Sequence, residues 1–230
     1  MNRNMKNTKS GKKSRYVLRL TKRGLSLCCA AMVLLLGLSY FFGRQMGISS
    51  TKYKAEILLV NDNHTLSADY VPEGLVNLYE QRHSFRLASS NIYLTRECYE
   101  PMQRMFAAAE ADDVNGFIVT SGYRDYRRQQ EIYATSEAGK AQQPGASEHQ
   151  TGLAFDVTTE TNDGFESTPQ YAWLCAHAHE YGFIQRYPAN KADVTGISYE
   201  PWHYRYVGIE AATRIHEEGI TLEEFVEKYC

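Results

Sequence analysis

Apolar positions along the chain form one long uninterrupted run near its beginning and short periodic stretches after it. Apolar side chains that recur every three or four positions predict helices over residues 72–82, 95–113, 125–138, 170–182, 209–218 and 222–228. Alternating or β-branched stretches predict strands over residues 116–123, 152–158, 183–187 and 203–207, and the apolar run at 56–61 is either a strand or a docking segment. Because these elements do not alternate regularly, we predict an α+β domain over residues 56–230.

The long apolar run has the properties of a membrane-spanning helix. Residues 24–43 carry no charge, and nine Lys or Arg stand between Arg3 and Arg23. About 20 helical residues cross a bilayer, and Lys and Arg stay on its cytoplasmic side. We therefore predict a single-pass protein of the cell membrane, with a basic cytoplasmic segment (1–23), a transmembrane signal anchor (24–43), a tether (44–55) and an extracellular domain (56–230).

A cleaved signal peptide is the alternative interpretation of the same run. Small residues of a cleavage site would then follow the apolar stretch, but Tyr40, Phe41 and Phe42 stand there instead. This favours an uncleaved anchor, and both interpretations export the domain.

Charge separates the N-terminal part from the domain. Residues 1–55 carry 12 Lys or Arg and no Asp or Glu, whereas residues 56–230 carry 13 Lys or Arg against 27 Asp or Glu, a difference of −14. The adjacent apolar run explains the basic segment better than a nucleic-acid partner does, so none is expected. Cys98, Cys175 and Cys230 are scattered without a C-x-x-C pair, which leaves one disulfide and three free thiols as alternatives.

Two stretches of the domain carry residue types that bind metals. In residues 147–156, SEHQTGLAFD, His149 on a loop and Asp156 on a predicted strand offer an imidazole nitrogen and a carboxylate oxygen, both of which are zinc ligands. In residues 200–205, EPWHYR, His203 would add a third ligand and leave the fourth coordination position open. The alternative for each stretch taken alone is a hydrogen-bonded or packed histidine.

Two further residues offer proton transfer and charge stabilisation. Glu200 precedes Pro201, which disfavours helix there, and a carboxylate that does not bind the metal would accept and return a proton. Arg124, in SGYRD at residues 121–125, carries a permanent charge and would stabilise a developing oxyanion. Taken alone, Glu200 is equally well a surface carboxylate and Arg124 a solvated side chain.

The three motifs S-x-x-R, S-x-H-x-x-G-x-A-x-D and E-x-W-H-x-R, in this order, resemble those of the zinc D,D-carboxypeptidase and D-Ala-D-Ala peptidase family. This family includes vancomycin-resistance D,D-carboxypeptidases, and it shares the hedgehog-like fold. Here the motifs lie at residues 121–124, 147–156 and 200–205. The resemblance implies a small antiparallel sheet with flanking helices, in this chain preceded by one N-terminal transmembrane helix.

The resemblance also implies a role for each matching residue. His149, Asp156 and His203 would bind Zn2+, Glu200 would be the catalytic base, and Arg124 would polarise the carbonyl. Four further positions would bind or shape the substrate: Gln129, Ser147, Ser121 and Trp202.

The sequence therefore predicts a membrane-anchored zinc D,D-carboxypeptidase that removes the terminal D-Ala from peptidoglycan stem pentapeptides. An L,D-carboxypeptidase or a peptidoglycan endopeptidase on the same scaffold is one alternative. A cell-wall-binding module without activity is another. The sequence does not predict an oligomeric state.

Overall fold

The computed structural model describes residues 57–136, 141–161 and 164–230. The predicted cytoplasmic segment, signal anchor and tether therefore lie outside the described residues. Within the described residues, no helix combines the length and the apolar character that crossing a membrane requires.

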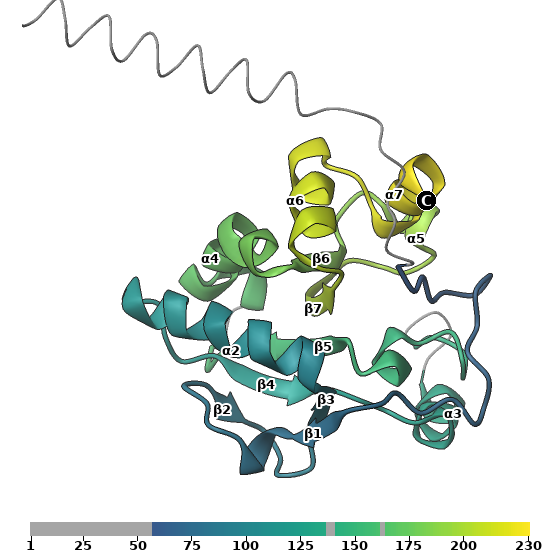
Figure 1. The fold of residues 1–230 in the computed structure, drawn as a ribbon, viewed down its shortest axis with the longest axis horizontal. Coiled ribbons are helices and arrows are strands. Elements are labelled where there is room, and N and C mark those ends of the chain that lie inside the picture. The colour runs from purple at the N-terminus through teal and green to yellow at the C-terminus, as the bar shows by residue number, and fades with distance from the viewer. Residues whose placement is uncertain (1–56, 137–140, 162–163) are drawn as a thin grey trace, which may run out of the picture. The chain divides into compact units, whose positions relative to one another are not determined.

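A five-stranded sheet forms the centre of the domain (Figure 1). Its strand order is β2 (Arg86–Leu87), β4 (Ile118–Ser121), β5 (Ala154–Thr158), β7 (Glu200–Tyr206) and β6 (Phe183–Tyr187). The pairs from β4 to β6 are antiparallel, and β2 pairs with β4 in parallel. A separate antiparallel pair joins β1 (Leu75–Asn77) to β3 (Tyr93–Thr95). The predicted α+β class is confirmed, and four of the five strands form the expected antiparallel arrangement.

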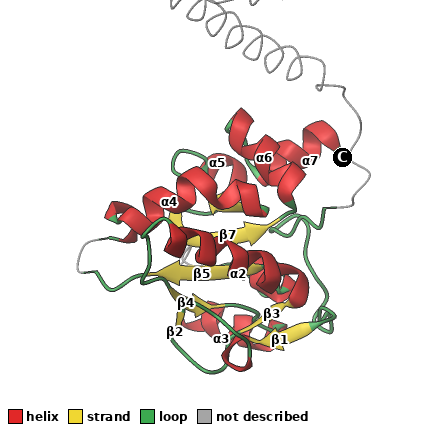
Figure 2. Cartoon of the chain, turned by 60° about the vertical axis from the view of Figure 1, so that its left-hand side comes forward, coloured by secondary structure: helices red, strands yellow, loops and turns green. Residues whose placement is uncertain are grey.

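Helix α2 (Arg96–Ala111) supplies most of the apolar cover of this sheet. Figures 1 and 2 show it lying across β4 and β5. Phe106 on its buried face packs against Phe155 of β5, with ring centroids 6.0 Å apart, and against Phe117, at 4.7 Å. The Thr95 side chain caps the helix by accepting a hydrogen bond from the backbone N–H of Cys98. This contact explains why the predicted start of the helix was correct to one residue.

The remaining α-helices of the described residues are short. They are α3 (Tyr126–Thr135), α4 (Pro169–His177), α5 (Ala192–Thr195), α6 (Ile209–Glu218) and α7 (Leu222–Tyr229). Helices α6 and α7 form a second apolar cluster with β6, to which Ile184, Ile215 and Phe225 contribute. The helices predicted at 209–218 and 222–228 agree with α6 and α7 to within one residue. The helix predicted at 170–182 is α-helical to His177 and continues as a 3-10 turn at Ala178–Tyr181. The helix predicted at 125–138 corresponds to α3, and its last two predicted residues, 137 and 138, lie outside the described residues.

The predicted helix over residues 72–82 is wrong. The chain forms β1 and then a single 3-10 turn at Leu78–Glu80. Leu78 is fully buried, and its N–H donates to the carbonyl of Ile92, so pairing with the β3 segment supplies the hydrogen bonds that a helix would have made internally. Strands β2 and β3 and helix α5 are too short to produce a periodic signal, and the sequence did not predict them.

Residues 57–60 form no strand, so the docking alternative is correct for this segment. Ile57 and Leu59 pack against the second apolar cluster. All three cysteines of the described domain, Cys98, Cys175 and Cys230, are free thiols, which decides between the two alternatives for them.

Sheet register brings the chemically interesting residues together. Asp156 on β5 stands opposite His203 on β7 and opposite Ser121 on β4. The residues preceding β5 form a 3-10 turn at Glu148–Thr151, which ends at Gly152 with a left-handed φ of 67°. Neighbouring strands and one tight turn therefore deliver the motifs to the same end of the sheet.

The turn at Gly152 generates a prediction about stability. A Cβ there would lie 2.9 Å from Thr95 Cγ2 and would adopt a positive φ, whereas a Cβ on Gly196, with φ of 74°, would meet open space. We expect Gly196→Ala to cost about 1–2 kcal/mol of unfolding free energy and Gly152→Ala about 1–3 kcal/mol more, because overpacking is added. Urea unfolding of the two variants measures the difference, and equal losses would contradict this account of the turn.

Candidate metal centre and active site

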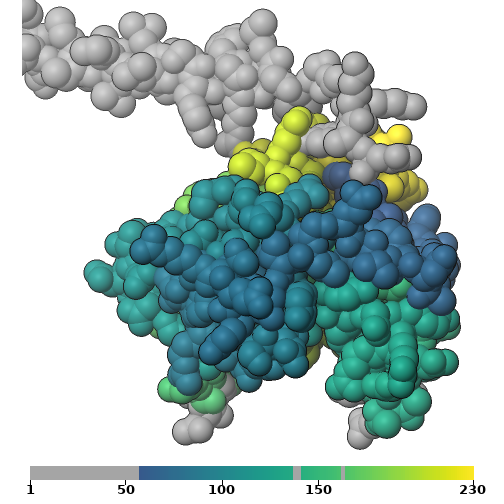
Figure 3. Space-filling model, turned by 60° about the horizontal axis from the view of Figure 1, so that its bottom comes forward, coloured from purple at the N-terminus to yellow at the C-terminus, as the bar shows by residue number. Residues whose placement is uncertain are grey.

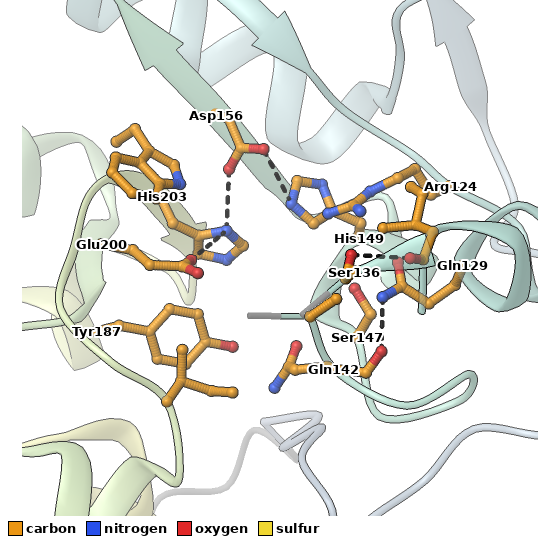
Figure 4. Close-up of a pocket in the computed structure, with 14 residues that line it drawn as sticks. Arg124, Gln129, Ser136, Gln142, Ser147, His149, Asp156, Tyr187, Glu200 and His203 are labelled. Carbon is orange, nitrogen blue, oxygen red and sulfur yellow. Dashed lines mark hydrogen bonds and ion pairs between the residues drawn. The ribbon is translucent and has the colours of Figure 1, made fainter. Parts of the chain in front are cut away.

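His149, Asp156 and His203 converge at the end of the sheet (Figure 4). His149 Nε2 lies 3.3 Å from Asp156 Oδ2, and His203 Nδ1 lies 3.1 Å from Asp156 Oδ1. One ligand atom from each residue falls within 4.8 Å of the others. Both imidazoles are 3% exposed and the carboxylate 18%, so the three side chains form a buried cup of nitrogen and oxygen donors.

The outer nitrogen of each imidazole has a partner that sets its tautomer. His149 Nδ1 lies 2.7 Å from the carbonyl oxygen of Gly122, to which it donates, so Nε2 keeps a free lone pair. His203 uses the opposite nitrogens: Nε2 faces Glu148 Oε2 at 3.4 Å, and Nδ1 faces the cup. Metal-binding histidines usually donate their other N–H to a carbonyl or a carboxylate. The residues present therefore fit a borderline divalent cation such as zinc.

The three groups have strongly shifted pKa values. Burial lowers the pKa of His203, but hydrogen bonds to Asp156 and Glu148 outweigh it and raise that pKa to about 9. Burial and the charge of Arg124 lower the pKa of His149 to about 4. Burial raises the pKa of Asp156, yet the two imidazoles hold it well below its usual range. At neutral pH the ionised carboxylate therefore faces one protonated imidazole, and a cation that binds displaces that proton.

Glu200 lies beside this cup and adds a second carboxylate to that of Asp156. It opens β7, and its Oε2 lies 3.9 Å from His203 Nδ1. Burial raises the pKa of the Glu200 carboxyl, although His203 and Arg124 lower it. A carboxylate with a raised pKa near a metal centre is suited to take up and release a proton.

Arg124 approaches the cup from the other side, after the end of β4 (Figure 4). Its backbone N–H donates to the carbonyl of His149, at 3.1 Å, which ties the arginine to the metal-binding turn. Burial lowers the pKa of its guanidinium, while Asp156 and Glu200 raise it. The Nε–H is buried and has no partner among the described residues. An unpaired buried donor leaves a positive group available to an oxygen of a bound molecule.

A pocket of about 200 Å³ lies against these groups. Three of the predicted substrate-contact residues line it: Gln129 on α3, the buried Ser147, and Trp202, which is 42% exposed. Helix α3 together with Ala141 and Gln142 forms one wall. In Figure 3 the teal-green part of the chain that contains them projects beside the rest of the domain. Ser121 does not line the pocket; it lies one strand away, opposite Asp156.

The structure adds two residues that sequence reasoning did not find. Tyr187 lines the pocket with its ring centroid 4.9 Å from that of His203, and its hydroxyl is buried without a partner among the described residues. Glu148 is fully buried behind His203. Tyr187 lies outside the three motifs, and Glu148 occupies the unspecified position between Ser147 and His149 in the middle motif.

A buried His2Asp donor set, with a separate carboxylate and an arginine facing the same pocket, defines the class of metal-dependent hydrolases. The model of the VanY family, described as D-alanyl-D-alanine carboxypeptidase, matches residues 91–209. The chain belongs to this family of zinc metallopeptidases.

A curated relative has the same described activity as the family. A D-alanyl-D-alanine carboxypeptidase of Enterococcus faecium is 36% identical over 178 residues, which are 76% of this chain and 58% of that protein. The alignment therefore spans little more than half of that relative's length.

Two solved structures have the same fold. The LdcB LD-carboxypeptidase has a TM-score of 0.66 and 37% identity, covering 75% of this chain and 86% of LdcB. A mutant of the vancomycin-resistance D,D-pentapeptidase VanY from a VanB-type cassette, in complex with Zn(II), has a TM-score of 0.59 and 38% identity, covering 73% of this chain and 97% of that one.

The geometry predicts which histidines bind a cation. We expect His203→Ala to weaken Zn2+ binding by more than about 100-fold, because loss of a ligand exceeds the 10–100-fold effect of losing an outer partner. His177→Ala is the matched control, since His177 is half-exposed on α4 and pairs with Glu180; its affinity should equal that of the unaltered protein. Competition with a chromophoric chelator measures both, and similar losses in the two variants would contradict the assignment.

Proposed function

We propose that this protein is a zinc D,D-carboxypeptidase that removes the C-terminal D-Ala from peptidoglycan stem pentapeptides. The observation that carries the proposal is the meeting of Glu200 and Arg124 at the pocket that the His149, Asp156 and His203 cup opens into. A binding module without activity would have no use for a half-buried carboxylate and an unpaired guanidinium donor beside the cup.

Different residues of the chain would bind the metal, transfer the proton and stabilise the developing negative charge. A zinc ion held by His149, Asp156 and His203 would supply Lewis acidity toward the scissile carbonyl and the attacking water. Glu200 takes the proton from that water and returns it to the leaving amine of D-Ala. Arg124 donates to the carbonyl oxygen as negative charge develops on it, from a position fixed before the reaction.

An L,D-carboxypeptidase is the second candidate, favoured by the structural similarity to LdcB. Both activities release a terminal D-Ala, and they differ in the configuration of the residue before it. The ligands and the base are not specific for that residue, so the two candidates share one mechanism and differ in the fit of the substrate.

A substrate series separates these candidates. We expect the zinc-loaded protein to release D-Ala from a stem pentapeptide, with little release from the tetrapeptide or from cross-linked muropeptide, as measured by mass spectrometry. Chelator should abolish the release and added Zn2+ restore it. Preferential release from the tetrapeptide would identify an L,D-carboxypeptidase, cleavage of the cross-link an endopeptidase, and saturable muropeptide binding without turnover a binding module.

Glu200 is the residue on which the mechanism can be tested. Glu200→Gln keeps the shape of the side chain but removes the base, so turnover should fall by about 100- to 10,000-fold while Zn2+ affinity is retained. Glu227→Gln removes the charge of an exposed carboxylate on α7 and should leave turnover unchanged. Full activity of Glu200→Gln would reject the assigned base.

We also propose that residues 24–43 anchor the protein in the cell membrane, with the domain outside. Nine Lys or Arg before an uncharged 20-residue run support this orientation. The full chain should sediment with membranes and resist a high-salt wash, whereas a chain starting at residue 44 should not sediment, and protease added to protoplasts should digest the domain. Release of the full chain by salt alone would contradict the anchor.

A further inference from the structure

Glu148 is a fully buried carboxylate that stands between the metal centre and two arginines. Its Oε1 accepts hydrogen bonds from Arg186 Nε, at 2.8 Å, and from Arg205 Nη1, at 3.0 Å. Its Oε2 lies 3.4 Å from His203 Nε2. The two arginine side chains are 0% and 1% exposed, so the whole cluster is removed from water.

The different contacts of the two Glu148 oxygens distinguish between two roles for this carboxylate: neutralising the arginines, and orienting His203. Pairing the arginines occupies Oε1, whereas Oε2 is turned toward the imidazole. A carboxylate needed only to neutralise the arginines would gain from a bidentate contact with one of them. Here the second oxygen instead accepts the N–H of a metal ligand, which is the arrangement that fixes the ring orientation in metal centres.

The two arginines also hydrogen-bond to the first described residues of the domain and to its last helix, α7. Arg186 donates through Nη1 and Nη2 to Glu223 of α7, at 2.8 and 2.5 Å, and Asn61 Nδ2 donates to the same carboxylate, at 3.2 Å. Arg205 Nη2 donates to the backbone carbonyl of Leu58, at 2.7 Å. Residues 58–61 and helix α7 both lie outside the stretch 91–209 that matches the family model. Two segments beyond that match are thus hydrogen-bonded to the groups that hold Glu148.

We propose that Glu148 is a positioning residue of the metal centre: it holds His203 with Nδ1 facing the cation, and the Arg186–Glu223 and Arg205–Leu58 contacts hold Glu148 in turn. The proposal rests on the zinc site of the proposed function. It assigns to α7 and to residues 58–61 a role in the affinity of that site for its metal.

Glu148→Gln tests the positioning role with little change of shape. If the amide nitrogen faces His203, it donates to Nε2, and the proton of the ring moves to Nδ1, where the cation binds. If the amide oxygen faces His203, the NH2 group points at two guanidinium donors instead. Both orientations disturb the site, so we expect Zn2+ affinity to fall by about 10- to 100-fold.

A control variant separates positioning from general loss of stability. Met105→Ala opens a cavity in the main apolar cluster, where Met105 is fully buried, and should lower the unfolding temperature of the metal-free chain without changing Zn2+ affinity. Glu223→Gln, further from the metal, should lower Zn2+ affinity less than Glu148→Gln does.

The experiment uses the full chain in three measurements. Chelator competition gives the Zn2+ affinity, the visible absorption of the Co2+-loaded protein reports the ligand geometry, and thermal unfolding of the metal-free protein reports stability. Lower affinity and an altered Co2+ spectrum in Glu148→Gln, with Met105→Ala unchanged in both, support the proposal. Unaltered affinity and spectrum in Glu148→Gln overturn it.

Two further outcomes are decisive as well. If Glu148→Gln does not fold, Glu223→Gln carries the test, and unaltered Zn2+ affinity and Co2+ spectrum in that variant overturn the proposal. An unaltered chain that binds Zn2+ but releases no D-Ala would refute the proposed function and leave the positioning role standing. Failure of the unaltered chain to bind Zn2+ would refute both.

Discussion

The antiparallel pairing of β5 with β7 is the constraint on which the site depends. It places Asp156 directly opposite His203, and the next pairing along the sheet places Ser121 on the other side of Asp156. Because a shift of one residue would turn each side chain to the opposite face of the sheet, the packing of Phe155 and Tyr204 in the main apolar cluster also determines where the two ligands point. The apolar packing that stabilises the core therefore also sets the positions of Asp156 and His203.

A second layer of polar contacts completes what the strands begin. The carbonyl of Gly122 and the carboxylate of Glu148 each accept the outer N–H of one imidazole, so each ring presents its lone pair from a different nitrogen. A Cβ on Gly122 would lie 2.4 Å from the carbonyl oxygen of Tyr93, which means that only glycine allows the β3 segment to approach this closely. Backbone fit and side-chain charge thus act together to fix the orientation of both rings, and loss of the His203 Nδ1 proton would leave each ring with its lone pair toward Asp156.

The sequence predicted the residues of this site that stand at fixed positions of its motifs and missed Glu148 and Tyr187, whose roles appear only from contacts with distant residues. Residues 147–156 carry their own turn, glycine and strand, so His149 and Asp156 could be recognised from one stretch. Glu148 differs, because its role is visible only from its hydrogen bonds with Arg186 and Arg205. These residues lie 38 and 57 positions further along the chain. The helix predicted at 72–82 failed for the same reason: pairing with β3, which is a non-local contact, outweighed the helical spacing of its leucines.

Because D,D- and L,D-carboxypeptidases would use the same metal chemistry, the residues that determine substrate preference must lie elsewhere in the pocket. Among the solved structures the chain is similar to both a D,D-pentapeptidase and an L,D-carboxypeptidase, at 38% and 37% identity, so these two structures alone do not separate the specificities. In the proposed mechanism the ligands, Glu200 and Arg124 act on the scissile bond, which joins a terminal D-Ala to the preceding residue in both kinds of substrate. The configuration of the preceding residue must then be read by side chains that line the pocket away from the metal. Gln129 and Trp202 line this pocket without belonging to the cup, whereas the ring of Tyr187 packs against that of His203 and its buried hydroxyl has no partner among the described residues.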